Sequence, residues 1–218
     1  MSEAGLSRRG FFFDLDGTIV DSREAYLEAA RVAFEFIGQD SPNPKIALEI
    51  PKRLEQRLPI DNIVNSNKRV FLDHYLKTYY SITRTKTKPW PNVQSTLEFI
   101  SKRATLGLIT MRYVPSASIR RELEFFKIAK YFMHVTTALE TSKPKPSPEA
   151  LIQCEKAIGI NLCNCTIVGD SISDVRAGKN AGIKTIAVLT GLFSYEELEK
   201  EHPDLILDSI NSIPRLLE

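Results

Sequence analysis

The chain has 218 residues, of which 43% are hydrophobic and 26% are charged, an ordinary composition for a folded globular protein. The formal net charge of +2 is too small to indicate nucleic acid as a partner, and no apolar run reaches the roughly 20 residues that a membrane-spanning helix needs. Residues 1–9 have no apolar segment typical of a signal peptide, so we expect a cytoplasmic protein with no membrane partner. We expect it to be a monomer or a homodimer.

The N-terminal part of the chain predicts one strand followed by a long helical region. Three phenylalanines at 11–13 form a short apolar strand. Three helices are then expected, over residues 22–37, 45–58 and 61–82, from the three- and four-residue spacing of apolar side chains. Nothing between Asp21 and Pro89 indicates a strand, so residues 21–88 are predicted to be a small helical bundle inserted into another domain.

From Asn92 onward, predicted helices alternate with short apolar strands. Strands are expected at 106–110, 133–135, 166–170, 184–189 and, at an edge of the sheet, 205–207; helices are expected at 93–102, 116–126, from Ser147-Pro148, at 171–181 and at the end of the chain. This alternation predicts an α/β fold with a doubly wound, Rossmann-like parallel sheet. Residues 1–20 and 89–218 would form this core domain.

The three cysteines do not indicate a disulfide framework, because they are few and odd in number. Cys163 and Cys165 could be half of a zinc site, but no second pair of ligands accompanies them. We therefore expect Cys163 and Cys165 to be buried thiols at the start of a strand.

A group of carboxylates follows the first predicted strand directly. Asp14 and Asp16 lie two residues apart, Gly17 and Thr18 form a turn, and Asp21 comes next, in the pattern D-x-D-G-T-x-x-D. Two like charges at the end of a buried strand are costly unless a cation lies between them. Mg²⁺, a hard cation that prefers oxygen ligands, would meet this need.

Further polar residues follow other predicted strands. Thr110 ends one strand, and Asp170 and Asp174 follow another after the tight corner at Gly169. Because the carboxyl ends of parallel strands meet at one edge of a sheet, these residues are expected to lie together. The stiff, proline-rich segment at 143–148 carries two lysines, Lys143 and Lys145, that could bring a cation to this acidic site.

These motifs, in this order, resemble those of the haloacid dehalogenase superfamily of phosphohydrolases. The resemblance implies that Asp14 is the nucleophile and that Asp16 is the general acid and base, with its main-chain carbonyl a metal ligand. It also implies phosphate binding by Thr110 and by Lys143, which heads the pattern Lys-Pro-x-Pro, and Mg²⁺ binding by Asp14, Asp16, Asp170 and Asp174. The helical insertion resembles the cap domain of the phosphoglycolate phosphatase-like and beta-phosphoglucomutase-like branches.

The residues after Thr110 depart from the pattern, since many relatives carry Asn where this chain has Met111, followed by Arg112. Only the main-chain amide of Met111 could serve a phosphate there, while Arg112 is a candidate to bind a second negative charge on the substrate. The insertion contains 12 Lys and Arg against 8 Asp and Glu between Ser22 and Lys88, a net charge of +4. This basic character suits a small phosphorylated metabolite that is itself anionic, such as phosphoglycolate.

Four readings of the motifs remain open from the sequence. The first is a Mg²⁺-dependent phosphomonoester hydrolase that forms an aspartyl-phosphate, and the second is a pyrophosphatase or a beta-phosphoglucomutase-like phosphotransferase on the same scaffold. Hydrolysis of a carbon–halogen bond needs no acid at Asp16 and is disfavoured by its presence. A non-catalytic regulator, similar to a receiver domain, is disfavoured by the complete set of motifs and by the large insertion.

Overall fold

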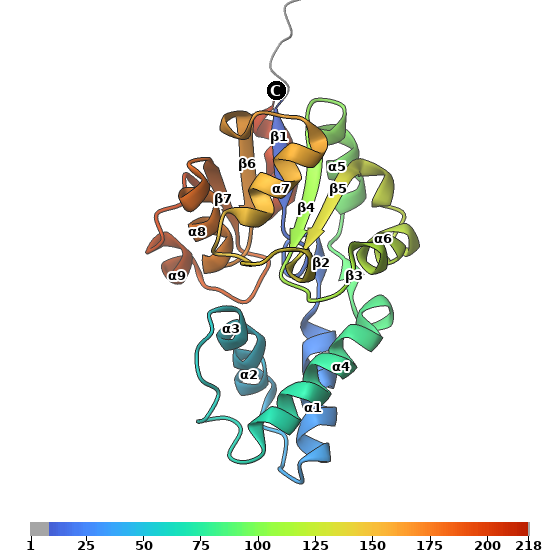
Figure 1. Cartoon of the computed structure of the whole chain (residues 1–218), viewed down its shortest axis with the longest axis vertical. Helices are drawn as coiled ribbons and strands as arrows, with labels where there is room; N and C mark the ends of the chain where they lie inside the picture. Colours follow the sequence, from blue (N-terminus) through green and yellow to red (C-terminus); the bar gives the residue numbers. More distant parts are fainter. Residues whose placement is uncertain (1–8, 218) are drawn as a thin grey trace, which may run out of the picture. The chain divides into compact units, whose positions relative to one another are not determined.

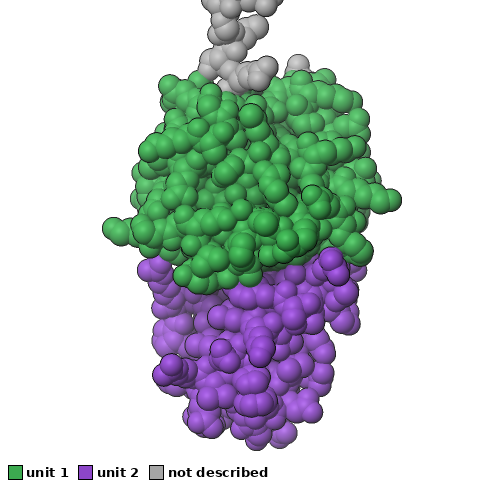
Figure 2. All heavy atoms as spheres, turned by 45° about the vertical axis from the view of Figure 1, so that its right-hand side comes forward, with its two compact units in different colours: residues 1–19, 89–218 green, residues 20–88 purple. Residues whose placement is uncertain are grey.

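The computed structural model describes residues 9–217, which fold as two compact units. The first unit takes the described residues up to Ile19 and those from Pro89 onward, and the second is Val20–Lys88. Figure 1 follows the chain through both units, and Figure 2 colours them separately.

A six-stranded parallel sheet is the centre of the first unit (Figure 1). Its order is β5-β4-β1-β6-β7-β8, formed by β1 (Gly10–Phe13), β4 (Thr105–Thr110), β5 (Phe132–Thr137), β6 (Cys165–Gly169), β7 (Lys184–Val188) and β8 (Leu205–Leu207). β1 pairs with β4 on one side and β6 on the other, so Phe13 lies beside Leu108 and Val168. The chain thus builds outward from β1 in both directions, and in such sheets ligands bind at the carboxyl ends of the strands where the order reverses.

Helices cover both faces of this sheet, as the sequence predicted. They are α5 (Val93–Ser101), α6 (Ser116–Phe125), α7 (Glu149–Ile158), α8 (Ile172–Ala181) and α9 (Tyr195–Glu199), with 3₁₀ turns at Ala129–Tyr131, Ala138–Glu140, Leu162–Asn164 and Ile210–Leu216. α7 packs against β4, β5 and α8, and Figure 1 shows α7 in front of the sheet and α5 behind it. The predicted fold class, a doubly wound α/β sheet, is confirmed.

The alternation of side chains along β1 explains how a run of three phenylalanines is accommodated. Phe12 is fully buried on the face covered by α7 and α8, in a cluster with Leu151, Cys154 and Ile167. Phe11 and Phe13 stack on each other with their ring centroids 6.1 Å apart, because residues two apart share a face of a strand. β1 is therefore buried on both faces, as the central strand of a parallel sheet must be.

Two of the three cysteines are buried and one is exposed. Cys154 and Cys165 lie in the cluster around Phe12, whereas Cys163 is exposed in the turn before β6. Burial raises the pKa of Cys154 to about 12 and that of Cys165 to about 11. The expectation of buried thiols is therefore correct for Cys165 and wrong for Cys163.

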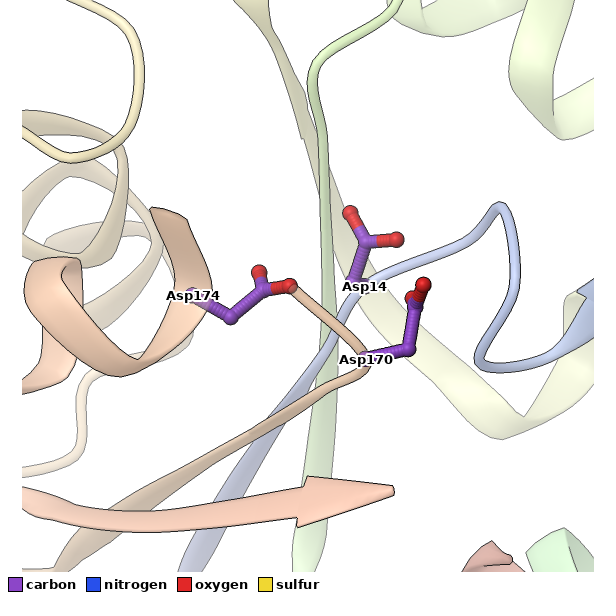
Figure 3. Close-up of side chains that lie close together, drawn as sticks. All are labelled: Asp14, Asp170 and Asp174. Atoms are coloured by element: carbon purple, nitrogen blue, oxygen red, sulfur yellow. The ribbon is translucent and has the colours of Figure 1, made fainter. Parts of the chain in front are cut away.

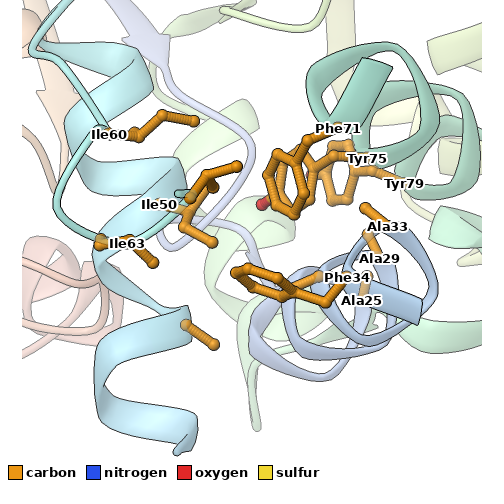
Figure 4. Close-up of a cluster of buried hydrophobic side chains, with 13 residues drawn as sticks. Ala25, Ala29, Ala33, Phe34, Ile50, Ile60, Ile63, Phe71, Tyr75 and Tyr79 are labelled. Atoms are coloured by element: carbon orange, nitrogen blue, oxygen red, sulfur yellow. The ribbon is translucent and has the colours of Figure 1, made fainter. Parts of the chain in front are cut away.

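The second unit is helical and has a hydrophobic core of its own (Figure 4). It contains α1 (Arg23–Phe36), α2 (Pro44–Ala47), α3 (Glu49–Glu55) and α4 (Lys68–Lys86). Alanines on one side of α1 let α4 pack closely against it, and Phe34 meets Phe71 with ring centroids 4.7 Å apart. Ile50 from α3 completes the core.

Two predicted helices of the second unit are shorter than expected. The helix over 45–58 is broken into α2 and α3, because Pro51 has no N–H to donate and its ring conflicts with the carbonyl of Ala47. Residues 61–67 form turns instead of the first two turns of α4, and the backbone of Ile63 and Asn65 bonds to the side chain of Gln39. The apolar residues that suggested a helix at 61–67 are buried from a turn instead.

The unit boundaries coincide with a short ribbon of two strands. β2 (Val20–Asp21) pairs with β3 (Lys88–Pro89), so the chain enters and leaves the second unit through adjacent strands. Within residues 9–217, no helix combines the length and the apolarity that crossing a membrane would need.

Candidate active site

Three buried carboxylates come together at the carboxyl ends of β1 and β6 (Figure 3). Asp14 follows β1, Asp170 follows β6, and Asp174 lies in the first turn of α8. Each of the three is at most 6% exposed, and one carboxylate oxygen from each lies within 4.8 Å of the others. The structure thus gathers three of the four metal ligands expected from the sequence.

A buried lysine partly neutralises this acidic cluster. The Nζ atom of Lys145 lies 2.5 Å from Asp14 Oδ1 and 2.5 Å from Asp174 Oδ1, and its side chain is 1% exposed. One ammonium among three buried carboxylates leaves an excess of negative charge, which is costly without a further cation. Oxygen-only donors of this kind suit Mg²⁺, so the residues present fit the cation that the sequence predicted.

The three carboxylates differ in how their oxygens are engaged. Both oxygens of Asp174 accept hydrogen bonds, Oδ1 from Lys145 and Oδ2 from the main chain and hydroxyl of Ser171. Asp170 Oδ1 accepts a 2.8 Å bond from the hydroxyl of Thr18. Asp14 and Asp170 are therefore better placed to bind a cation directly, and Asp174 is better placed to orient Lys145.

Two glycines allow the chain to approach this cluster closely. A Cβ atom at Gly169 would lie 2.1 Å from the carboxyl carbon of Asp174, and one at Gly17 would lie 2.3 Å from Asp170 Oδ2. Gly17 also has a φ of 84°, in the left-handed region that favours glycine. The D-x-D-G corner and the Gly169-Asp170 corner are thus required by the packing of the carboxylates themselves.

Burial raises the pKa of Asp14 well above its usual value, and the negative charges of Asp174 and Asp16 act in the same direction. The Lys145 ammonium opposes them and favours the ionised form. A cation bound beside Asp14 would also favour ionisation, which a carboxylate nucleophile requires.

The lysine at the site is Lys145, so the register expected from the sequence is corrected. Lys143 has an exposed side chain, and its main-chain N–H donates to Glu149 Oε2. Glu149 also binds Ser142, while Asn180 donates to the carbonyl of Pro146. These bonds fix the loop so that Lys145 enters the cluster and Lys143 remains in solvent.

Thr110 ends β4 and Met111 and Arg112 follow it, as expected, but the contacts of Arg112 were not foreseen. Thr110 is buried, and Met111 is partly exposed. Arg112 is 4% exposed, and its guanidinium donates to Asp16 and to Glu122 of α6. The sequence made Arg112 a candidate to bind the substrate, whereas its guanidinium contacts Asp16 and Glu122. Glu122 was missed, because a single Glu within a helix carries no signal of its own.

Comparison with known proteins identifies the family. The sequence-family model of the haloacid dehalogenase-like hydrolases matches residues 11–188 of this chain. The chain belongs to this family. It is therefore an enzyme of the hydrolase class, as the motifs predicted.

Individual relatives and solved structures agree with this assignment. The chain is 28% identical to a phosphoglycolate phosphatase of Escherichia coli (strain K12) over 241 residues, covering 94% of this chain and 90% of that protein. It is also 28% identical to a phosphoglycolate phosphatase of Pseudomonas fluorescens over 233 residues, covering 98% and 82%. A haloacid dehalogenase-like family hydrolase from Streptococcus pneumoniae has a similar fold, with a TM-score of 0.81 at 20% identity over 97% of this chain and 99% of that one. The predicted family resemblance is confirmed.

Proposed function

We propose that the protein is a Mg²⁺-dependent phosphomonoester hydrolase, a phosphatase, that acts on a small anionic metabolite through an aspartyl-phosphate intermediate. The observation that carries this proposal is Asp14, a buried carboxylate at the carboxyl end of β1 that touches Lys145 and lies beside Asp170 and Asp174. The phosphoglycolate phosphatases among its relatives support the same activity.

In the proposed reaction, Asp14 attacks phosphorus, and Asp16 protonates the leaving oxygen. Asp16 then removes a proton from the water that hydrolyses the aspartyl-phosphate. The hydroxyl of Thr110 and the ammonium of Lys145 bind phosphoryl oxygens, since this chemistry depends mainly on positioning and on stabilisation of charge. Thr110 Oγ1 accepts the main-chain N–H of Arg112 at 3.2 Å, so its own hydrogen is available for a phosphoryl oxygen.

Mg²⁺ would be held by Asp14, Asp170 and the main-chain carbonyl of Asp16, with Asp174 beside them. When bound, the cation would neutralise charge on the phosphoryl group and on Asp14. Lys145 alone does not neutralise the three buried carboxylates, and the excess of negative charge that remains supports the binding of a divalent cation.

The decisive experiment measures phosphatase activity with and without Mg²⁺ in the wild type and in Asp14→Asn. Asp208→Asn is the matched control, because Asp208 is an exposed carboxylate of the same unit. We expect activity only with the divalent cation, full activity in the control and none in Asp14→Asn. After an acid quench, wild-type protein should carry a phosphoryl group on Asp14, identified by peptide mass spectrometry. Activity that survives thorough chelation, or more than a few per cent activity in Asp14→Asn, would overturn the proposal.

The preferred substrate is proposed to be phosphoglycolate or a similarly small phosphate ester with a carboxylate. The net charge of +4 on residues 22–88 supports a substrate with a second negative charge. The test compares kcat/KM for phosphoglycolate, a neutral phosphate ester of similar size, glucose 1-phosphate and pyrophosphate. Phosphoglycolate should give the highest value, whereas a clear preference for one of the other three would reject this substrate class.

A further inference from the structure

A second charge cluster joins Asp16 to two buried residues, Arg112 and Glu122, to which the proposed mechanism gives no role. Figure 3 shows the neighbouring carboxylates Asp14, Asp170 and Asp174. Arg112 donates from Nε to Asp16 Oδ2 at 2.7 Å and from Nη2 to Asp16 Oδ1 at 2.6 Å. Its third nitrogen, Nη1, donates to Glu122 Oε2 at 2.7 Å. The side chains of Arg112, Asp16 and Glu122 are 3%, 13% and 6% exposed, so solvent screens these contacts only weakly.

Arg112 is held from both ends. Its main-chain N–H donates to Thr110 Oγ1 at 3.2 Å, and its carbonyl accepts the N–H of Ala138, which follows β5, at 3.2 Å. At the other end, Glu122 in α6 binds the guanidinium nitrogen that does not face Asp16. The plane of the guanidinium is therefore set by the sheet and by α6, independently of Asp16.

This arrangement fixes the plane of the Asp16 carboxylate. Two parallel bonds from one planar fork determine both the position and the rotation of a carboxyl group, which a lysine, as a point charge, could not do. Each carboxylate oxygen has two lone pairs, and the fork uses one on each oxygen. The fork thus fixes the orientation of Asp16, and it does not use the second lone pair of either oxygen.

We propose that Arg112 and Glu122 are positioning residues that orient Asp16 as the base in the hydrolysis of the phosphoenzyme. This inference rests on the proposed function. In that step, a water O–H bond breaks and its proton passes to an oxygen of Asp16. The water oxygen bonds to phosphorus, and the bond between phosphorus and Asp14 breaks, with its electron pair returning to the Asp14 carboxylate. Phosphate leaves with the water oxygen.

Formation of the phosphoenzyme and its hydrolysis can be measured separately, and a poorly oriented Asp16 should slow only the hydrolysis. With an activated aryl ester such as p-nitrophenyl phosphate, the leaving group needs little protonation, so kcat/KM reports formation of the phosphoenzyme. Loss of the base slows only the later hydrolysis. Therefore kcat and KM should fall together while kcat/KM changes little, and the phosphoenzyme should accumulate.

Two conservative variants test this expectation. Arg112→Lys keeps the charge but loses the fork, and Glu122→Gln keeps the shape but loses the charge that anchors Arg112. We expect kcat to fall about 10-fold to 100-fold in Arg112→Lys and about 10-fold in Glu122→Gln. The matched controls are Arg121→Lys and Glu124→Gln, two exposed neighbours on α6, and both should behave as wild type.

The assays are steady-state kinetics and the fraction of phosphoenzyme found after an acid quench, which should rise in both variants. Thermal unfolding shows whether each variant is folded, and Glu122→Gln, as the isosteric change, still provides the test if Arg112→Lys fails to fold. A higher KM for phosphoglycolate with unchanged kcat would show that Arg112 binds substrate and would overturn the inference. An equal loss of kcat and kcat/KM without more phosphoenzyme would show a purely structural role and would overturn it too. If wild-type protein forms no phosphoenzyme, the proposed function fails first, which distinguishes the two results.

Discussion

Replacing Lys145 by methionine should destabilise the fold more than any exposed lysine replacement, because it leaves two carboxylates buried without their cation. Lys145 Nζ lies 2.5 Å from both Asp14 and Asp174, and the three side chains are 1%, 8% and 2% exposed. Removing one partner of a buried ion pair costs about 3–5 kcal/mol, a large part of the ~5–15 kcal/mol by which a domain is stable. The matched variant Lys143→Met, two residues away and exposed, should change stability by no more than about 0.5 kcal/mol.

The assay is urea unfolding of Lys145→Met and Lys143→Met in the presence of a chelator. The pKa of Asp14 in the folded protein lies above its ordinary value of 3.8. As the pH is lowered, Asp14 therefore takes up its proton at a higher pH in the folded protein than in the unfolded chain. Folding stability associated with Asp14 therefore falls as the pH rises through that higher pKa, and the deficit of Lys145→Met should shrink when the pH is lowered from neutrality. A loss below about 1 kcal/mol in Lys145→Met, or a larger loss in Lys143→Met, would refute the reasoning.

Three more outcomes are expected. Mg²⁺ should raise the Tm of the wild type, by the equivalent of about 2.7 kcal/mol at 100 times its Kd, and Asp170→Asn should abolish that rise in a thermal-shift titration. Gly169→Ala should impair both activity and Mg²⁺ binding, because its Cβ would lie 2.1 Å from the carboxyl carbon of Asp174. In the control Gly159→Ala the new Cβ meets no atom within 4 Å, so this variant should lose only about 1 kcal/mol of stability, owing to its positive φ. A fully active Gly169→Ala would contradict the packing argument. A thiol reagent at pH 8 should modify Cys163 quickly and the two buried thiols only after unfolding, and fast modification of more than one thiol in the native protein would be inconsistent with their burial.

The sequence predicted the elements whose signal is local. An apolar run followed by D-x-D-G can be recognised as a strand and a corner, because the whole signal lies within a few consecutive residues. Asp14 and Asp170 follow their strands and Thr110 ends its strand, as expected. The helix predicted over 61–82 begins only at Lys68, because the preceding turns are held by Gln39, which lies far away in the sequence.

The errors at the site have the same origin. Which lysine of the proline-rich loop reaches Asp14 depends on bonds from Glu149 and Asn180 that no spacing rule contains. Likewise, Arg112 could be recognised as a charge near the site, but its orientation depends on Glu122, ten residues later on another element. Contacts between side chains of separate elements were thus the part that the sequence alone did not reveal.

The ribbon of β2 and β3 brings together the two ends of the segment 20–88. Because the chain departs and returns through paired strands, and the N–H of Trp90 donates to the carbonyl of Ile19 at 3.1 Å, the two ends of this segment are already joined across its base. Its hydrophobic cluster takes its buried side chains from residues 25–79, from helices and turns alike. Because its ends are already paired, this segment could be exchanged for one of different length, or replaced by a short turn, without changing where the chain leaves and re-enters the first unit.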